Sequence, residues 1–478
     1  MAKKDNLQFG SWHIGGTGLI LNGILNLDEE TGELDLFSDE PLSLPYNTDV
    51  VYGKTYQGAA FTLYGCSIQG GRTSSFVHDY ESKYTYKISC NYILEGANFT
   101  AEQEILVKEV YFSVTNLNKW AFQNAVDIKL DDSSEYIITT NPIDDITHKN
   151  EEFEFTIRYI TLADYNYRFT SSLKISTNVQ LILKFKNPTS LKRAHILIYK
   201  VRDFFSLCIN SNTYIDYISA APHYITPQQV EMPIKVYGQA IEFGKNEKVE
   251  ELKNYHSYIS LEHIKKDFNT CMKNWFEKSE KLKPVIDLYL SLNYHRTSYE
   301  RHFLNLVQAL EAYHRLTRKN QVLPKDEHVK KMESIIANVP EEHQEWVKGK
   351  LAFSDEPSLH ERLEELLTPT GKSDSPDYEA KYHHLFRLRN KKKIEIIRDI
   401  KNTRNYNTHF DERLLKKSLK GEELYQLILL LSLMMEYYLL MELEIEENII
   451  VDLTWKKAGE ISTRNSLIEA TRDSNITF

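Results

Sequence analysis

The first half of the chain alternates between apolar and polar positions with the period of two that is typical of half-buried strands. The alternation is clearest in Tyr84–Leu94, Phe153–Ile160 and Leu181–Phe185. Clusters of Asn, Asp, Gly and Pro separate such segments, for example Asn141–Asp145. Short strands at this spacing predict a mostly β, sandwich-like or barrel-like domain. One amphipathic helix over Ser190–Leu207 is expected to interrupt it.

The period changes to that of a helix after about Gly244. The charged run Lys245–Asn254 is typical of a linker, and nearly every periodic segment beyond it is helical. We therefore expect an α+β protein with a β-rich domain over residues 1–245 and an all-α bundle over residues 256–478. The expected helices are Ser298–Thr317, His328–Ala337, Glu345–Ala352, Leu359–Leu367, Tyr378–Thr403 and Glu422–Glu446, with a loosely held end from about Lys456.

One stretch, Tyr425–Leu443, is long and apolar enough to suggest a membrane-spanning helix. Glu436 interrupts it and Glu442 lies near its end, so the favoured interpretation is a buried core helix and no membrane contact. The N-terminal residues have no apolar stretch behind them that would make a signal peptide.

The four cysteines, at positions 66, 90, 208 and 271, are far apart and form no CxxC pair. They predict neither a zinc site nor a disulfide framework and fit reduced thiols in a cytoplasmic protein. No HExxH motif or close carboxylate pair indicates metal hydrolysis, and Thr370–Ser373 lacks the earlier glycine of a P-loop because Leu366 stands there. We therefore expect no metal and no cofactor.

Charge is distributed unevenly along the chain. The net charge of −10 argues against nucleic-acid binding by the whole protein, and residues 1–250 hold 22 basic against 31 acidic residues. Residues 381–420, however, hold 13 basic and only 4 acidic residues. A local basic patch is what phosphate binding requires, although a solvated helix face has the same composition.

The stretch Lys401–His409 carries the candidate chemistry. Its Asn and Thr residues weaken a helix, so we expect Arg404 at a helix end and His409 on the following turn or helix. RNA cleavage without a metal needs a group of near-neutral pKa to move the 2′-OH proton, and a fixed cation to hold the phosphate. His409 and Arg404 are of those two types. On chemistry alone, an ordinary surface turn explains the same pair.

The spacing Arg404-x4-His409, with the polar Asn405 directly after the Arg, resembles the signature of HEPN domains, many of which are ribonucleases. The helix Arg301–Arg315 resembles the first HEPN helix of the ApeA-like anti-phage defence proteins. Gly10–Trp12, Tyr52–Tyr64 and Leu117–Trp120 resemble their N-terminal domain. The resemblance covers most of the chain.

This resemblance implies a metal-independent endoribonuclease of tRNA or other cellular RNA, acting in abortive infection and leaving 2′,3′-cyclic phosphate and 5′-hydroxyl ends. It implies a homodimer through the HEPN domain, with Arg404 and His409 of both chains in one composite site supported by Asn405, and it allows a phage-derived trigger. Glu311 and His314 share a helix face and either orient that pair or form an ordinary surface stripe. Tyr406 either stacks on a base or belongs to the core. The expected RNA contacts are Lys391, Lys392, Lys393, Arg398, Lys401 and Tyr406.

Two other functions stay open. The helical domain could dimerise or bind RNA without cutting it, beside a ligand-sensing β domain. The β domain could instead be a carbohydrate- or lyase-like enzyme, although no acid–base pair for such an enzyme is evident in residues 1–245.

Overall fold

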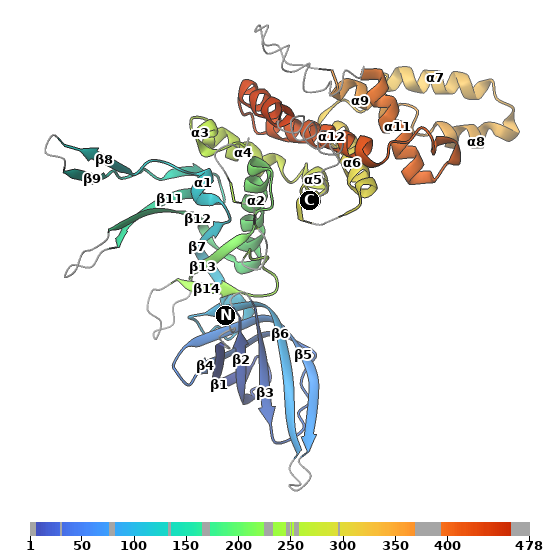
Figure 1. The fold of residues 1–478 in the computed structure, drawn as a ribbon. Coiled ribbons are helices and arrows are strands. Elements are labelled where there is room, and N and C mark those ends of the chain that lie inside the picture. The colour runs from blue at the N-terminus through green and yellow to red at the C-terminus, as the bar shows by residue number, and fades with distance from the viewer. Residues whose placement is uncertain are drawn as a thin grey trace, which may run out of the picture. The chain divides into compact units, whose positions relative to one another are not determined.

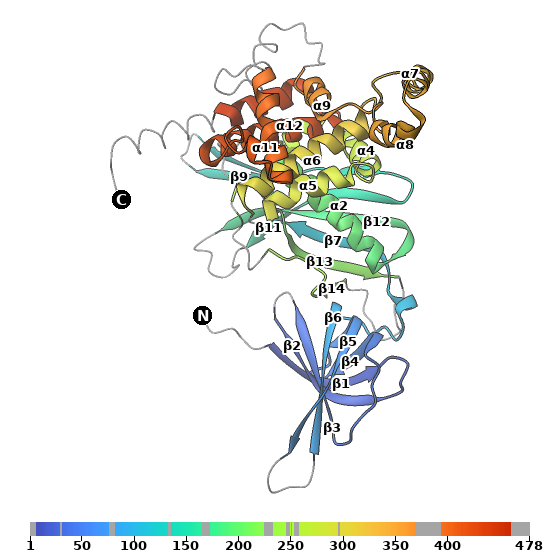
Figure 2. The same cartoon turned by 90° about the vertical axis from the view of Figure 1, so that its right-hand side faces the viewer.

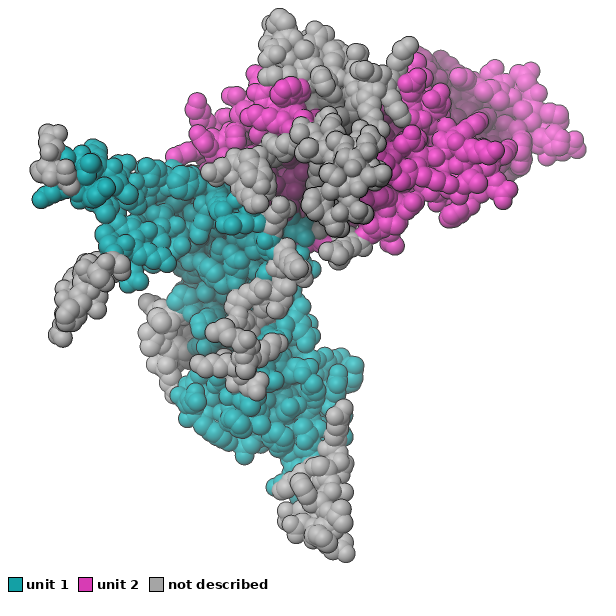
Figure 3. Space-filling view, viewed as in Figure 1, with its two compact units in different colours: residues 1–205, 212–253 teal, residues 206–211, 254–478 magenta. Residues whose placement is uncertain are grey.

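The computed structural model describes residues 6–28, 31–75, 82–131, 135–164, 173–223, 233–244, 249, 251–252, 258–294, 297–368 and 393–459. The chain divides into two compact units, one of residues 1–205 and 212–253 and the other of residues 206–211 and 254–478 (Figure 3). The first unit is mostly strands and the second is helical, which confirms the predicted α+β fold class.

Strands β1 to β6 of the first unit close into an antiparallel barrel (Figures 1 and 2). The ring closes because β5 pairs with both β4 and β6. Trp12 is fully buried in the barrel core, and Gly53 makes room for it, since a Cβ at Gly53 would lie 2.7 Å from the indole ring. The bounds are Asn6–Ile14 (β1), Ile20–Leu27 (β2), Gly32–Ser38 (β3), Asn47–Thr55 (β4), Ala60–Ser75 (β5) and Ser82–Glu95 (β6).

An open antiparallel sheet continues the barrel, because β14 pairs with β6 and the order then runs β13, β7, β12, β11 and β10. The predicted amphipathic helix is α2, Leu191–Ile209, which lies over one face of this sheet (Figure 2). Its Phe205 ring packs against Trp120 at a centroid distance of 4.7 Å, and Leu117 and Trp120 are both buried in the core. The remaining bounds are Glu102–Glu104 (η1), Leu106–Val114 (β7), Leu117–Trp120 (α1), Val126–Leu130 (β8), Tyr136–Thr140 (β9), Ile146–Lys149 (β10), Phe153–Asp164 (β11), Lys174–Ser190 (β12), Ile215–Pro222 (β13) and Ile234–Tyr237 (β14).

The helical unit is built around α6, Tyr299–Thr317, which packs against α5, α9, α11 and α12 (Figure 1). Ser298 caps α6, since its hydroxyl accepts a hydrogen bond from the Arg301 amide at 3.3 Å. Helices α7 and α8 pair with each other, and no residue of either is buried. The bounds are Leu261–Ile264 (α3), Phe268–Lys278 (α4), Lys283–Tyr294 (α5), Lys325–Ala337 (α7), Glu341–Leu351 (α8), Leu359–Leu366 (α9), Lys393–His409 (α11), Glu412–Leu414 (η3) and Gly421–Glu442 (α12).

Helix α12 is the one described helix that is long and apolar enough to cross a membrane, and 78% of its most apolar window is buried within the protein. The sequence predicts such a buried helix at this place. The prediction of a loosely held end from Lys456 is wrong for the residues that the structure describes, because 447–459 are helical. Within that helix Lys457 forms an ion pair with Glu436 of α12.

The first prediction concerns the contribution of the Glu436–Lys457 ion pair to stability. The two side chains are buried, being only 5% and 11% exposed. Replacing Lys457 with Met leaves a buried carboxylate without its cation, a change that typically costs about 3–5 kcal/mol. We expect Lys457→Met to lower the unfolding free energy by about that amount in urea denaturation followed by helical circular dichroism. The double variant Glu436→Gln/Lys457→Met should recover most of the loss. Wild-type stability of Lys457→Met would show that the pair contributes nothing.

Candidate functional site

Helix α11 carries the candidate chemistry and lies against α6 and α9. Its buried residues are Ile396, Ile397, Ile400 and Thr403, which follow the spacing of one helix face. The Thr403 hydroxyl also accepts a hydrogen bond from the Leu419 amide at 3.0 Å. The apolar face therefore fixes the rotation of α11, and Thr403 ties the segment after the helix back to it.

Arg404 and His409 both lie in this helix, and the prediction that the helix ends near Arg404 is wrong. The Asn and Thr residues do not break it, and two of their side chains bond to groups other than the local backbone of the helix. Thr403 accepts from Leu419, and Asn405 accepts from the Arg404 side chain. The helix ends at His409, and the next residue, Phe410, adopts a left-handed φ of 51°.

Arg404 and His409 leave the helix in different directions, roughly 140° apart at 3.6 residues per turn. Lys401, Asn405 and His409 follow at four-residue spacing, so they share a face opposite the buried one. Arg404 is half-buried at the flank, and its Nη1 donates to Asn405 Oδ1 at 3.2 Å. This bond turns the guanidinium toward the His409 face. His409 itself is exposed and has no hydrogen bond to the described residues.

The basic residues expected to contact RNA lie in different settings. The Arg398 side chain is 64% exposed, with its Nε 3.9 Å from the Asp399 carboxylate, and Lys401 is half-buried on the same helix. Lys393 is held by α9, because its ammonium donates to the Thr368 hydroxyl and lies 3.9 Å from the Glu364 carboxylate. Lys391 and Lys392 lie outside the described residues.

Tyr406 is half-buried one helical turn before Phe410. Its ring centroid lies 6.2 Å from that of Phe410, and the Lys420 ammonium lies 5.3 Å from the Tyr406 centroid. Tyr406 is thus partly packed within the unit, and both interpretations that the sequence left open, base stacking and membership of the core, stay predictions.

Glu311 and His314 share a face of α6, but within the described residues neither side chain forms a hydrogen bond or ion pair with Arg404 or His409. His314 is fully buried; its Nε2 donates to Glu365 at 2.8 Å, and its Nδ1 accepts from Arg362 at 3.0 Å. Both ring nitrogens are thus used by α9. Glu311 is half-buried and acts electrostatically on Arg362.

Burial lowers the pKa of His314, and the Glu365 carboxylate opposes that shift, while Arg362 adds to it. The imidazole is therefore neutral at pH 7, as its acceptor role toward Arg362 requires. Sequence reasoning missed Arg362 and Glu365, because a Glu-rich segment such as α9 has the composition of a solvated helix. Residue spacing along α9 gives no sign that the Arg362 side chain is only 5% exposed.

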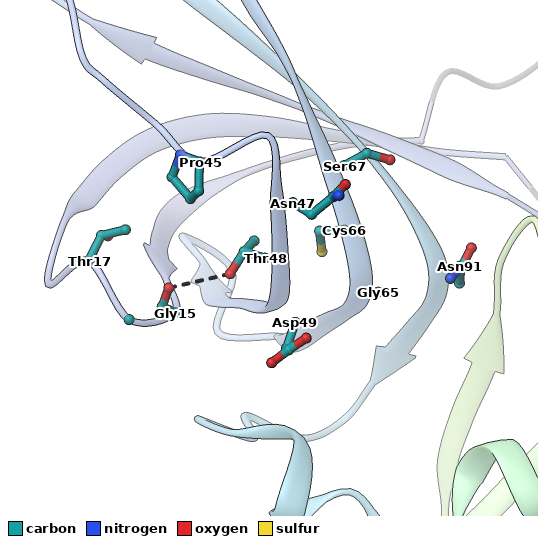
Figure 4. A pocket seen from close by; sticks show the side chains of 11 residues that line it. Gly15, Thr17, Pro45, Asn47, Thr48, Asp49, Gly65, Cys66, Ser67 and Asn91 are labelled. Atoms are coloured by element: carbon teal, nitrogen blue, oxygen red, sulfur yellow. Dashed lines mark hydrogen bonds between the residues drawn. The ribbon is translucent and has the colours of Figure 1, made fainter.

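A hollow of about 540 Å³ lies at the barrel of the first unit (Figure 4). The Gly15–Thr17 part of its wall is a hairpin turn between β1 and β2, and the Thr48 hydroxyl donates to the Gly15 carbonyl at 3.3 Å. Its polar groups are neutral apart from Asp49, and no Lys or Arg is among its lining residues. That lining suits a neutral ligand rather than a phosphate. The lining residues are Gly15, Gly16, Thr17, Pro45, Asn47, Thr48, Asp49, Gly65, Cys66, Ser67 and Asn91.

Cys66 is an unreactive part of this wall, because burial raises the pKa of its thiol to about 12. All four cysteines are buried and free. Among the described residues no group of three or more His, Cys, Asp or Glu side chains is placed to hold a metal ion.

The first unit is built from strands, and the second is helical and carries Arg404-x4-His409 on one helix. This combination is that of a two-domain protein with a HEPN-like C-terminal domain. The family model for ApeA N-terminal domain 1 matches residues 9–275, and the model for Apea-like HEPN matches residues 304–449. Neither the curated proteins nor the solved structures contain a match to the chain.

The chain belongs to the ApeA-like family, with an ApeA N-terminal domain and a C-terminal HEPN domain. This family indicates a nuclease-type role in anti-phage defence.

The buried His314 generates the second prediction. Its folded-state pKa is lowered, so between the folded and unfolded pKa values the unfolded chain binds a proton that the folded chain does not. Stability is therefore fully present above pH 6.5, the unfolded value, and is lost as the pH falls below it. We expect amide exchange of α6 to accelerate progressively from pH 7.5 to 5, after correction for intrinsic exchange.

His314→Gln should flatten this pH dependence, although His302, whose pKa burial also lowers, leaves part of it. His360→Gln is the matched control, because the His360 side chain lies on α9 and is 42% exposed. An unchanged pH profile in His314→Gln would mean that His314 does not link protonation to stability.

Proposed function

We propose that this protein is a metal-independent endoribonuclease, with Arg404 and His409 as its catalytic pair. The observation that carries the proposal is the polar face at the end of α11. There an exposed His409 shares a face with Lys401 and Asn405, and the Asn405 amide holds the Arg404 guanidinium toward it. The family's nuclease-type role supports the same assignment.

The chemistry follows from these groups. A base removes the proton of the 2′-OH, the 2′-oxygen attacks the adjacent phosphorus, and the P–O5′ bond breaks as the 5′-oxygen takes up a proton. The products are a 2′,3′-cyclic phosphate and a 5′-hydroxyl. His409 moves the proton, and Arg404 stabilises the charge that builds on the phosphate oxygens.

The reaction needs a base and an acid, whereas each α11 offers one exposed histidine beside the Arg. When two copies face each other, His409 of one chain can work with Arg404 of the other, and solvent water completes the second proton transfer. The roughly 140° between Arg404 and His409 also favours contributions from two chains. We therefore include a homodimeric composite site in the proposal, with cellular RNA such as tRNA cut in the cytoplasm during abortive infection after a phage-derived trigger.

The third prediction concerns the catalytic pair and is checked in a cleavage assay on tRNA or total RNA with EDTA present. Arg404→Ala and His409→Ala should each lower the cleavage rate by about 100-fold or more, because each removes one of the two required groups. The cut RNA should carry 2′,3′-cyclic phosphate ends. His343→Ala, at a 61% exposed histidine of α8, is the control and should cut like wild type. A wild-type enzyme that needs Mg²⁺, or a His409→Ala variant that cuts normally, contradicts the mechanism.

The fourth prediction tests whether the site spans two chains. Inactive Arg404→Ala and inactive His409→Ala proteins are mixed under conditions that allow subunit exchange. If Arg404 of one chain works with His409 of the other, half of the exchanged dimers are mixed, and each mixed dimer regains one of its two pairs. We expect roughly a quarter of the wild-type rate on this statistical argument. No recovery, with exchange verified by mass spectrometry, would place the working pair within one chain.

A second function is a non-cleaving RNA-binding or dimerisation module beside a ligand-sensing β unit. The hollow of the barrel favours it, because a polar lining that is neutral apart from Asp49 suits a small ligand without negative charge. RNA binding by wild type without cleavage, with or without phage infection of the host cell, would support this function over the first.

A further inference from the structure

Phe410 follows His409 directly and occupies a costly position. Its φ of 51° is left-handed, a region that bulky residues rarely adopt because the Cβ crowds the backbone. The Phe410 amide ends the helix by donating to the Tyr406 carbonyl at 2.7 Å. Glycine or asparagine ends a helix in this way with little or no strain. The backbone therefore gives no reason for a phenylalanine here.

Packing gives no reason either, because Phe410 is 73% exposed. A phenylalanine on the surface gains little from removal of apolar area from water. A residue with a strained backbone and an exposed side chain, next to a proposed catalytic group, is typical of a functional position rather than a structural one.

The surroundings of Phe410 combine an aromatic ring with lysines, and the Asp411 carboxylate that follows Phe410 is paired with Arg413. The Tyr406 ring meets it at 68° with centroids 6.2 Å apart, and the Lys420 ammonium lies 5.3 Å from the Tyr406 centroid. Lys416 and Lys417 are exposed on the segment that connects Phe410 to Lys420. Two rings with nearby cations suit a partner that has both flat apolar faces and negative charges.

We propose that Phe410, with Tyr406 and Lys420, forms a stacking site for an unpaired nucleobase of the RNA. Single-stranded RNA is bound by aromatic rings that stack on bases and by cations that contact the phosphates. The lysines argue against an apolar contact between two copies of the chain at this place. The site rests on the proposed ribonuclease function for its role, which is to select single-stranded segments for cutting next to His409.

The test measures RNA binding separately from cleavage. Full-length His409→Ala protein, which holds its RNA uncut, is titrated with a fluorescent single-stranded RNA of ten nucleotides. Adding Phe410→Leu keeps an apolar side chain but removes the ring, and should weaken binding roughly tenfold, as expected for the loss of one stacked base. Phe410→Trp should bind like the parent or more tightly. The matched control is Phe353→Ala, a 77% exposed phenylalanine after α8, which should bind like the parent.

Two further measurements identify the interaction. An RNA with one abasic nucleotide should lose affinity for the parent protein but not for Phe410→Leu, since only the parent offers the ring. Phe410→Gly should keep or raise the thermal midpoint, because glycine relieves the left-handed strain, and should still lose RNA affinity.

Equal RNA affinity of Phe410→Leu and the parent overturns the stacking site. Conversion of the protein to monomers by Phe410→Leu also overturns it, in favour of a contact between copies. The catalytic proposal can fail independently of this one. If RNA stacks on Phe410 but wild type never cuts it, the stacking site is supported and the ribonuclease function is wrong. If Phe410→Leu binds RNA normally while Arg404→Ala does not cut it, the stacking site is wrong and the catalytic proposal stands.

Discussion

The apolar face of α11 is the constraint on which the candidate site depends. Ile396, Ile397, Ile400 and Thr403 bury this face in the helical unit, and their burial fixes which side chains of the helix reach solvent. Each buried Ile contributes on the order of 1.5–3 kcal/mol, so rotation of the helix about its axis is strongly opposed. His409 is exposed as a direct consequence, because it lies on the opposite side of the same helix.

Two different kinds of polar interaction surround this face. Inside the unit, the buried His314 and Arg362 bond to each other, and His314 also bonds to the exposed Glu365 carboxylate, while Glu436 pairs with Lys457. Such groups are costly to bury unless each finds a partner, so the first set fixes α6 against α9 and the second fixes α12 against the helix of residues 447–459. At the surface, by contrast, Arg404 has a single bond to its neighbour Asn405 and His409 has none to the described residues. A rigid interior thus supports a polar surface whose groups are left available.

The fold class could be predicted from sequence because the spacing of hydrophobic residues changes from every second residue to about every 3.6 residues near Gly244. The first spacing is that of a strand with one buried face, and the second is that of a helix with one buried face. The closure of β1 to β6 into a barrel could not, because it depends on β5 pairing with both β4 and β6, and alternation along one strand does not name its neighbours. The same limit hid the partners of His314, of which Glu365 lies 51 residues away in the chain.

At the site, sequence reasoning found Arg404 and His409 from their chemistry and their family resemblance, and it misplaced the helix end between them. Helix propensity counts Asn and Thr as weak formers because their side chains compete for the backbone. Here Thr403 and Asn405 bond to Leu419 and Arg404 instead, so that competition does not arise. The importance of Phe410 was also missed, because the residue type at a position does not determine its backbone φ angle.

The continuous helix changes what the site requires. Had the chain bent after Arg404, one protomer could have closed both side chains around a phosphate. A straight α11 leaves them on a convex surface, where a phosphate meets the Arg and the His from different sides and bulk water covers both. Electrostatic stabilisation by an Arg is strong only where water is excluded. A convex helix end therefore needs an opposing surface to become a catalytic site. In the proposed composite site, a second α11 with the same basic and aromatic groups would be that surface and would also contact the RNA.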